Sequence, residues 1–293
     1  MTRLYLHQTN DRRLASDYAG DVLLWDIDKT YLDTRFSSVR GLLGIPFELA
    51  VDKTPIIGSV SLLRALRRGP GPQPALVPLY FVSGSPVQLR RVIEQRMTLD
   101  GVQFDGVTFK DQLGLLRAGR LTDLTRQVGY KLAALLLYAR ALPIGARWLM
   151  FGDDVEQDAE IFALFGEVCA GLRGGALVTR LREQTVHPRD IAAIEAIVAE
   201  LTPRPDPVER IFIHRTRTTS DVKFSDARVV ATRSYLQSAL VLAHWRKIAP
   251  EVIGTLAKEL RHRGVLDVDI EAQVSETARE WHVSADLVEL AAC

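Results

Sequence analysis

Two aspartates and a threonine follow a short apolar run near the start of the chain. Val22 to Trp25 are all apolar, and Asp26, Asp28 and Thr30 come next at alternate positions. A short, continuous apolar run is typical of a strand buried on both faces of a parallel sheet. Ligands bind just beyond the carboxyl ends of such strands, so this spacing places carboxylates where chemistry usually happens. Asp is also a common turn residue, so on this stretch a simple turn remains an open alternative.

Two later apolar runs also end in polar or acidic residues. The run Leu76 to Val82 is followed by Ser83, and the run Arg147 to Phe151 is followed closely by Asp153. A further carboxylate, Asp158, opens the helix that comes next. Parallel strands carry their carboxyl ends to one edge of a sheet, so these side chains are expected to meet those of the first run.

Strand-like and helical patterns alternate along most of the chain. Strands are predicted over 4–6, 22–25, 76–82, 107–109, 147–151 and 210–214, and helices over 56–68, 130–142, 158–165, 191–201 and 235–245. This alternation favours an α/β fold with a parallel sheet flanked by helices. Lys131 lies in the first turn of one of these helices.

The same patterns indicate how the chain is divided. Residues 1–249 are expected to form one catalytic domain, in which 171–207 is a helical insertion. Residues 250–293 show helical periodicity throughout. We therefore expect this last segment to be a helical appendage that lies outside the catalytic core.

Composition and charge exclude several functional classes. The 293 residues carry a formal net charge of +1, which gives no global field for binding nucleic acid. The two cysteines form neither a disulfide framework nor a zinc spacing, which fits a reducing compartment. The N-terminus has no apolar core of signal-peptide length, and arginines and a proline interrupt the most apolar stretch, 132–151. No transmembrane segment is expected, and the sequence does not indicate an oligomeric state.

Four short motifs occur in a fixed order along the chain. They read DIDKT, LYFVSGSPVQL, YKLAAL and MFGDDVEQDAEIF, and each has the strand or helix context described above. Together they resemble the motifs of the haloacid-dehalogenase-like (HAD) phosphatase superfamily. The chain is most similar to the catalytic domain of the actin-patch-associated phosphatidate phosphatases, over residues 20–165 and more loosely over 208–248. Lys29 departs from that family, which has an acidic residue at this position.

The resemblance implies a HAD-type, Rossmann-like parallel sheet and a phosphomonoester hydrolase. In the family pattern Asp26 is the nucleophile that forms an aspartyl phosphate, and Asp28 protonates the leaving group and then activates water. Ser83 would donate to a phosphoryl oxygen, and Lys131 would balance the acidic cluster. Taken singly, Ser83 could instead cap a helix and Lys131 could be a solvated helix lysine.

The resemblance also implies a site for Mg²⁺. Asp26 and Asp153 would bind the ion through carboxylates and Asp28 through its backbone carbonyl. Asp158 would hold the ion or its waters, and Asp154 is left unassigned. Magnesium prefers such a sparse set of oxygens, completed by water and phosphate. Without a cation, four converging carboxylates would repel one another and some would become protonated.

The sequence leaves little room for a cap domain over the site. Residues 35–54 are too few for a full cap, and residues 95–128 could hold a small helical element. An open site with minimal or no cap suits a phosphorylated substrate presented at a surface. This agrees with the lipid phosphate, such as phosphatidate, that the resemblance implies, and we expect a cytoplasmic protein with peripheral contact to membranes. A soluble phosphomonoester is the alternative substrate.

Two non-enzymatic alternatives compete with the phosphatase. A phospho-acceptor switch also places an Asp at a strand end near a Lys, but the second acid, Asp28, argues for turnover. An inactive HAD-fold scaffold is disfavoured because all four motifs are intact. Three basic residues at or just after the end of the predicted strand 210–214 could contact an anionic substrate or simply be solvated. They are His214, Arg215 and Arg217.

Overall fold

The computed structural model describes residues 4–33, 54–216 and 224–292. Within them, seven strands form one sheet in the order β1-β4-β3-β2-β5-β6-β7. The strands are β1 Leu6–Gln8, β2 Asp21–Asp26, β3 Leu79–Pro86, β4 Gly106–Lys110, β5 Arg147–Asp153, β6 Val208–His214 and β7 Val229–Thr232. β1 runs antiparallel to β4, and the other neighbouring strands are parallel. The predicted α/β fold with a parallel sheet is confirmed.

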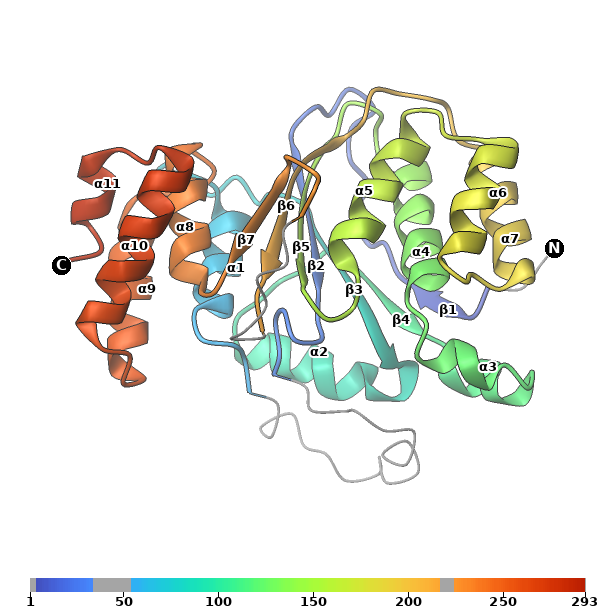
Figure 1. The fold of residues 1–293 in the computed structure, drawn as a ribbon, viewed down its shortest axis with the longest axis horizontal. Helices are drawn as coiled ribbons and strands as arrows, with labels where there is room; N and C mark the ends of the chain where they lie inside the picture. The colour runs from blue at the N-terminus through green and yellow to red at the C-terminus, as the bar shows by residue number, and fades with distance from the viewer. Residues whose placement is uncertain (1–3, 34–53, 217–223, 293) are drawn as a thin grey trace.

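Helices cover both faces of this sheet (Figure 1). They are α1 Ser59–Arg68, η4 Val87–Leu89, α2 Arg90–Leu99, α3 Gln112–Arg117, η5 Leu121–Leu124, α4 Val128–Ala141, α5 Asp158–Cys169, α6 Gly174–Glu183, α7 Pro188–Ala199, α8 Tyr235–His244, α9 Glu251–His262, α10 Asp267–Trp281 and α11 Ala285–Glu289. Helices α4 to α7 bury their apolar side chains against one face. Helices α1, α2 and α8 to α11 belong to the apolar layer on the other.

The central strand β2 lies where the chain reverses its course through the sheet. From β2 the chain moves outward through β3 and β4, then crosses back to β5 and moves outward again through β6 and β7. Ligands of open α/β sheets bind at such a switch point, beyond the carboxyl ends of the strands. β3 continues past Val82 to Pro86, so Ser83 lies within the strand, although the apolar pattern predicted that the strand ends before it.

A row of stacked aromatic rings aligns β2, β5 and β6. Trp25 stacks on Phe151 at a ring-centroid distance of 4.3 Å, and Phe151 stacks on Phe212 at 4.8 Å. The same residues are register partners in the sheet. A slip of one residue would turn each ring to the opposite face, so the rings help to specify the register. The register brings Asp26 and Asp153 to the same edge.

The C-terminal helices pack directly on the sheet-bearing part of the protein. α9 contacts α1 and α8, and α10 contacts α8. Ile253, Leu256 and Val274 are buried in the same apolar cluster as Trp25 of β2. The segment 250–293 is helical, as predicted. Its separation from the catalytic core stays a prediction, and its apolar side chains are buried in the layer that also covers β2.

Two other segments bear on access to the site. Residues 171–207 contain α6 and α7, and α7 packs against α4. Residues 95–128 include the short helical elements α3 and η5. The expectation that residues 35–54 form no cap falls, apart from residue 54, outside the described residues. Among the residues that the structure describes, no helix combines the length and apolar character needed to cross a bilayer.

Candidate active site

A tight turn follows β2 and contains Asp28. The backbone N–H groups of Tyr31 and Leu32 both donate to the carbonyl of Ile27, at 3.0 and 2.9 Å. Lys29 has a φ of 59°, in the left-handed region that residues with a Cβ rarely adopt. The chain therefore bends back immediately after the strand, and Asp28 lies inside the bend.

Two serines of β3 hold the carboxylate of Asp28. The hydroxyl of Ser83 donates to Oδ2 at 2.7 Å, and the hydroxyl of Ser85 donates to Oδ1 at 2.8 Å. The backbone N–H of Ser85 donates in turn to Oγ of Ser83 at 3.0 Å. Both serines are thus partners of the acid, and Ser83 makes no helix cap, since the cap position is Pro86. Two donors fix the orientation of the Asp28 carboxylate.

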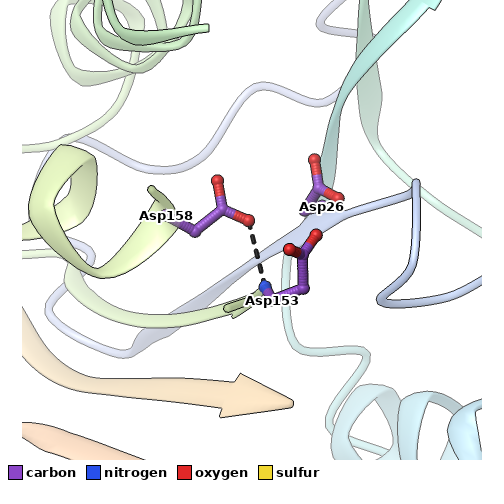
Figure 2. Close-up of side chains that lie close together, drawn as sticks. All are labelled: Asp26, Asp153 and Asp158. Atoms are coloured by element: carbon purple, nitrogen blue, oxygen red, sulfur yellow. Dashed lines mark hydrogen bonds between the residues drawn. The ribbon is translucent and has the colours of Figure 1, made fainter. Parts of the chain in front are cut away.

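Three aspartates converge at the carboxyl edge of the sheet (Figure 2). Asp26 ends β2, Asp153 ends β5 and Asp158 opens α5. One carboxylate oxygen of each lies within 4.8 Å of the others, and all three side chains are buried. Oδ2 of Asp158 accepts a hydrogen bond from the backbone N–H of Asp153 at 3.1 Å. A Cβ at Gly152 would lie 2.4 Å from the Asp158 side chain, so this close approach requires glycine.

Lys131 supplies a positive charge inside this cluster. Its Nζ lies 2.8 Å from Oδ1 of Asp26 and 2.5 Å from Oδ1 of Asp158. Burial lowers the pKa of Lys131, but the neighbouring carboxylates, Asp158 first, raise it by more, so the net pKa is well above the ordinary value. The alternative of a solvated helix lysine is wrong, because the side chain is fully buried.

Several carboxylate oxygens of the cluster are suited to a cation. Oδ2 of Asp26 and Oδ2 of Asp153 are buried without a hydrogen-bond donor among the described residues. Oδ1 of Asp26 meets Lys131 as an ion pair without hydrogen-bond geometry. Burial raises the pKa of Asp26 well above its ordinary value, against the effect of Lys131. Burial, followed by the charge of Asp158, raises the pKa of Asp153 to about 8.

These three aspartates fit Mg²⁺, which prefers hard carboxylate oxygens and whose charge would relieve the repulsion among them. Asp28, which the resemblance also places at the metal, directs its carboxylate to the serines of β3. Its expected contribution through the backbone carbonyl stays a prediction. Asp26, Asp153 and Asp158 are therefore the side chains that could hold the ion.

Glu156 is a further carboxylate at the cluster, which the sequence motifs did not single out. Its Oε2 lies 3.0 Å from Nζ of Lys131, and its backbone N–H donates to Oδ1 of Asp153 at 3.0 Å. Burial raises the pKa of Glu156. The signal in the sequence was an acidic residue two positions before Asp158. Spacing within a turn does not tell an inward carboxylate from a solvated one.

The residues around the end of β6 have structural contacts. His214 is largely buried, and its ring stacks on Tyr235 at 5.0 Å. Burial lowers the pKa of His214 to about 4, so the ring is neutral at neutral pH and offers no positive charge to an anion. Asp154 accepts hydrogen bonds from the backbone and hydroxyl of Thr216, at 3.0 and 2.8 Å. Arg217 lies outside the described residues.

The site lies within a stretch of the chain that matches a known family. The family model for the catalytic domain of phosphatidate phosphatase APP1 matches residues 22–169, about half of the chain. The matched range includes every residue expected to take part in catalysis or metal binding. No curated protein and no solved structure matches the chain. On the strength of the family match, the chain belongs to the family of the phosphatidate phosphatase APP1 catalytic domain.

Proposed function

We propose that this chain is a magnesium-dependent HAD phosphatase that hydrolyses a lipid phosphomonoester, such as phosphatidate, through an aspartyl phosphate. The family supports a phosphatase and phosphatidate as its substrate class. The observation that supports this mechanism is that Asp26 and Asp28 have different surroundings. Asp26 faces Lys131 and keeps an oxygen without a hydrogen-bond donor among the described residues. Asp28 is held by the hydroxyls of Ser83 and Ser85.

Asp26 is suited to be the nucleophile. Its Oδ2 accepts no hydrogen bond from a described residue, and Lys131 at 2.8 Å favours the ionised carboxylate. Attack of this oxygen on phosphorus forms an acyl phosphate on Asp26 and expels the alkoxide of the substrate. Lys131 lies where it can offset negative charge on the nucleophile and on the incoming phosphoryl group. Mg²⁺, held by Asp26, Asp153 and Asp158, would add positive charge against the phosphoryl oxygens.

Asp28 is suited to move protons in both half-reactions. In the first it gives a proton to the leaving alkoxide, and in the second it takes a proton from the water that attacks the acyl phosphate. The two serine hydroxyls fix its carboxylate in one direction. Ser83, which donates to Asp28 in this structure, would donate to a phosphoryl oxygen when substrate binds.

We also propose how the chain is organised and where it meets its substrate. The catalytic residues and the sheet lie within residues 1–249, with 171–207 as an insertion that supplies α6 and α7, and the helices after residue 250 pack on this unit. The substrate is met at the surface of a membrane on the cytoplasmic side. The absence of a spanning helix among the described residues is consistent with peripheral contact.

Trapping the intermediate tests the mechanism. Asp28→Asn keeps the size of the side chain and removes the base, so with an aryl phosphate, whose leaving group needs no proton, labelled protein should accumulate. General acid–base help is worth about 10²- to 10⁴-fold in rate, and hydrolysis of the intermediate should slow by that factor. Wild type should release phosphate continuously, and Asp26→Asn should take up no label. If wild type and Asp28→Asn both take up one phosphate and stop, the protein is a switch and the proposal fails.

A comparison of substrates tests the second part of the proposal. Phosphate release should be faster from phosphatidate in detergent micelles than from a panel of soluble phosphomonoesters. Asp26→Asn, assayed on the same panel, controls for contaminating phosphatases. If a soluble phosphomonoester is hydrolysed faster than phosphatidate, the lipid is not the preferred substrate. The aspartyl-phosphate mechanism is unaffected by that result.

A further inference from the structure

The segment that follows β4 exposes three leucines within nine residues. Leu113 and Leu116 of α3 are 40% and 48% exposed, and Leu121 at the start of η5 is 59% exposed. We call these three side chains the leucine patch. The same segment buries Leu115 and Leu124, which anchor it to the domain. Exposed leucines that cluster in this way mark an interaction surface more often than scattered ones do.

The charges around the leucine patch are positive. Arg117 and Arg126 are exposed. Asp111 is buried and caps the start of α3, and Asp123 is buried and accepts from Arg120 at 2.7 Å. Within 111–127, which the structure describes in full, no carboxylate is exposed. Arg126 also lies 3.5 Å from the buried carboxylate of Asp123. The surface therefore combines apolar side chains with two exposed arginines and no exposed carboxylate.

A direct hydrogen bond joins this segment to the candidate active site. Nε2 of Gln112, the first residue of α3, donates to the carbonyl of Gly84 at 2.8 Å. Gly84 lies between Ser83 and Ser85, the two residues that hold the carboxylate of Asp28. In Figure 1, α3 lies beyond the end of the sheet to which β3 and β4 run. A partner that covers the leucine patch therefore lies beside the end of β3 that carries the two serines bound to Asp28.

We propose that the leucine patch, with Arg117 and Arg126, binds the surface of an anionic lipid bilayer and presents the active site to lipid headgroups. Short apolar side chains enter the boundary between headgroups and acyl chains, and arginines add attraction to anionic lipids. The binding itself follows from the patch and its charges. The consequence for catalysis rests on the proposed function, because it requires that the substrate be a lipid phosphate.

Co-sedimentation with vesicles tests the binding. The vesicles are phosphatidylcholine alone and an equimolar mixture of phosphatidylcholine and phosphatidylserine. Wild type should bind the anionic vesicles more tightly. Leu113→Gln/Leu116→Gln should weaken binding to both by about tenfold or more, since apolar contact is lost. Arg117→Gln/Arg126→Gln should weaken binding to the anionic vesicles by about thirtyfold, the effect of two cations near an anionic surface, and should spare the neutral ones.

The turn between α9 and α10, with the first residues of α10, offers a matched control. Leu266 and Val268 are each 65% exposed, but they alternate with Asp267 and Asp269. This turn lies at the other end of the molecule from α3 in Figure 1. Leu266→Gln/Val268→Gln should bind both vesicles as wild type does. Three results would each overturn the proposal: wild type that binds neither vesicle, patch variants that bind like wild type, and a control that loses binding equally.

A second measurement separates vesicle binding by the leucine patch from catalysis at the active site. Phosphate release from a short-chain phosphatidate that is dispersed as monomers requires no vesicle. The leucine variant should hydrolyse this substrate at the wild-type rate and lose activity on phosphatidate held in vesicles. Asp26→Asn should bind vesicles normally and hydrolyse neither substrate. Vesicle binding by a wild type without phosphatase activity would leave the docking surface standing and would remove the proposed function.

Discussion

Nζ of Lys131 lies 2.8 Å from Oδ1 of Asp26, and both side chains are fully buried. The same ammonium lies 2.5 Å from Asp158 and 3.0 Å from Glu156. One cation therefore faces three carboxylates, and Asp153 adds a further negative charge nearby. Burial, together with the charges of the neighbouring carboxylates, raises the pKa values of Asp26 and Asp153 against the effect of Lys131. The cluster therefore carries an excess of negative charge, which a dication would complement.

Replacing Lys131 by Met should lower kcat by roughly 100- to 1000-fold, because preorganised positive charge of this kind is worth about that much. It should also lower the free energy of unfolding by about 3 to 5 kcal/mol, since buried carboxylates lose their partner. Phosphate release and urea unfolding measure the two effects. Lys110→Met is the control, because Lys110 is also a buried lysine and donates to the carbonyls of Leu124 and Arg126. An equal loss of kcat in both variants would contradict a role specific to Lys131.

Lys110 should also give the stability of the protein a pH dependence that is separate from catalysis. Burial lowers the pKa of Lys110 to about 8, from 10.5 for an ordinary lysine. Between these values the unfolded chain binds more protons, so the free energy of unfolding should rise with pH, by about 3 kcal/mol over the whole window. Urea unfolding across this range should show the rise in wild type and a smaller one in Lys110→Met. Equal rises would show that this ammonium is not the cause.

Magnesium should stabilise the folded protein. An ion that binds the folded state and not the unfolded chain contributes about 2.7 kcal/mol at a hundredfold excess over its Kd. Melting temperatures with Mg²⁺ and with a chelator measure this effect. Asp153→Asn should remove most of the increase in melting temperature. Asp154→Asn should keep it, because the carboxylate of Asp154 already accepts two hydrogen bonds from Thr216. A wild type that melts at one temperature under both conditions, and works fully in chelator, would contradict the metal site.

Much of this arrangement could be predicted from local sequence. Asp26 and Asp153 follow apolar runs, and Lys131 and Asp158 lie in the first turns of helices, so their places relative to the sheet edge follow from strand and helix direction. A strand end is a local property. Because β3, β2 and β5 are neighbours in the sheet, their carboxyl ends lie side by side and bring the site residues together.

The features that sequence reasoning missed depend on contacts across the fold. Ser85 received no catalytic role from the sequence, and its hydroxyl reaches Asp28 from the neighbouring strand β3. Glu156 lies in a turn, where the direction of a side chain depends on backbone angles that spacing does not encode. β7, Val229–Thr232, has four residues, too few for a periodic pattern. The helical periodicity after residue 250 predicted helices correctly but could not show what their apolar faces cover.

Gly152→Ala should lower kcat by at least about tenfold, since a one-ångström displacement of catalytic groups can cost more than that. The added Cβ would lie 2.4 Å from Asp158 and would push the start of α5 away from Asp153. Gly175→Ala is the control: in α6 its Cβ would meet nothing within 4 Å. That variant should keep wild-type kcat and gain up to about 1 kcal/mol of stability. If Gly152→Ala also keeps wild-type kcat, the close approach of Asp158 is not needed.

Helix α8 connects the C-terminal helices to the catalytic turn. Tyr235, the first residue of α8, donates its hydroxyl to the carbonyl of Thr30, two residues after Asp28. α9 and α10 pack on α8. Leu256 of α9 is buried and lies so close to Gly58 that a Cβ there would be 2.8 Å from its Cδ2. The C-terminal helices therefore support the helix that holds the turn after β2.

A chain that ends at Pro250 should consequently aggregate, because the truncation exposes the apolar side chains of α1 and α8 that α9 and α10 cover. Leu256→Ala provides a milder test, and it should lower the free energy of unfolding by about 2 to 5 kcal/mol. Leu266→Ala, at a position 65% exposed, should change it by less than about 0.5 kcal/mol. Urea unfolding of the two variants gives the comparison. A soluble truncated chain with the wild-type melting temperature would show that the sheet and its inner helices fold without this segment, and that the helices after Pro250 are an appendage after all.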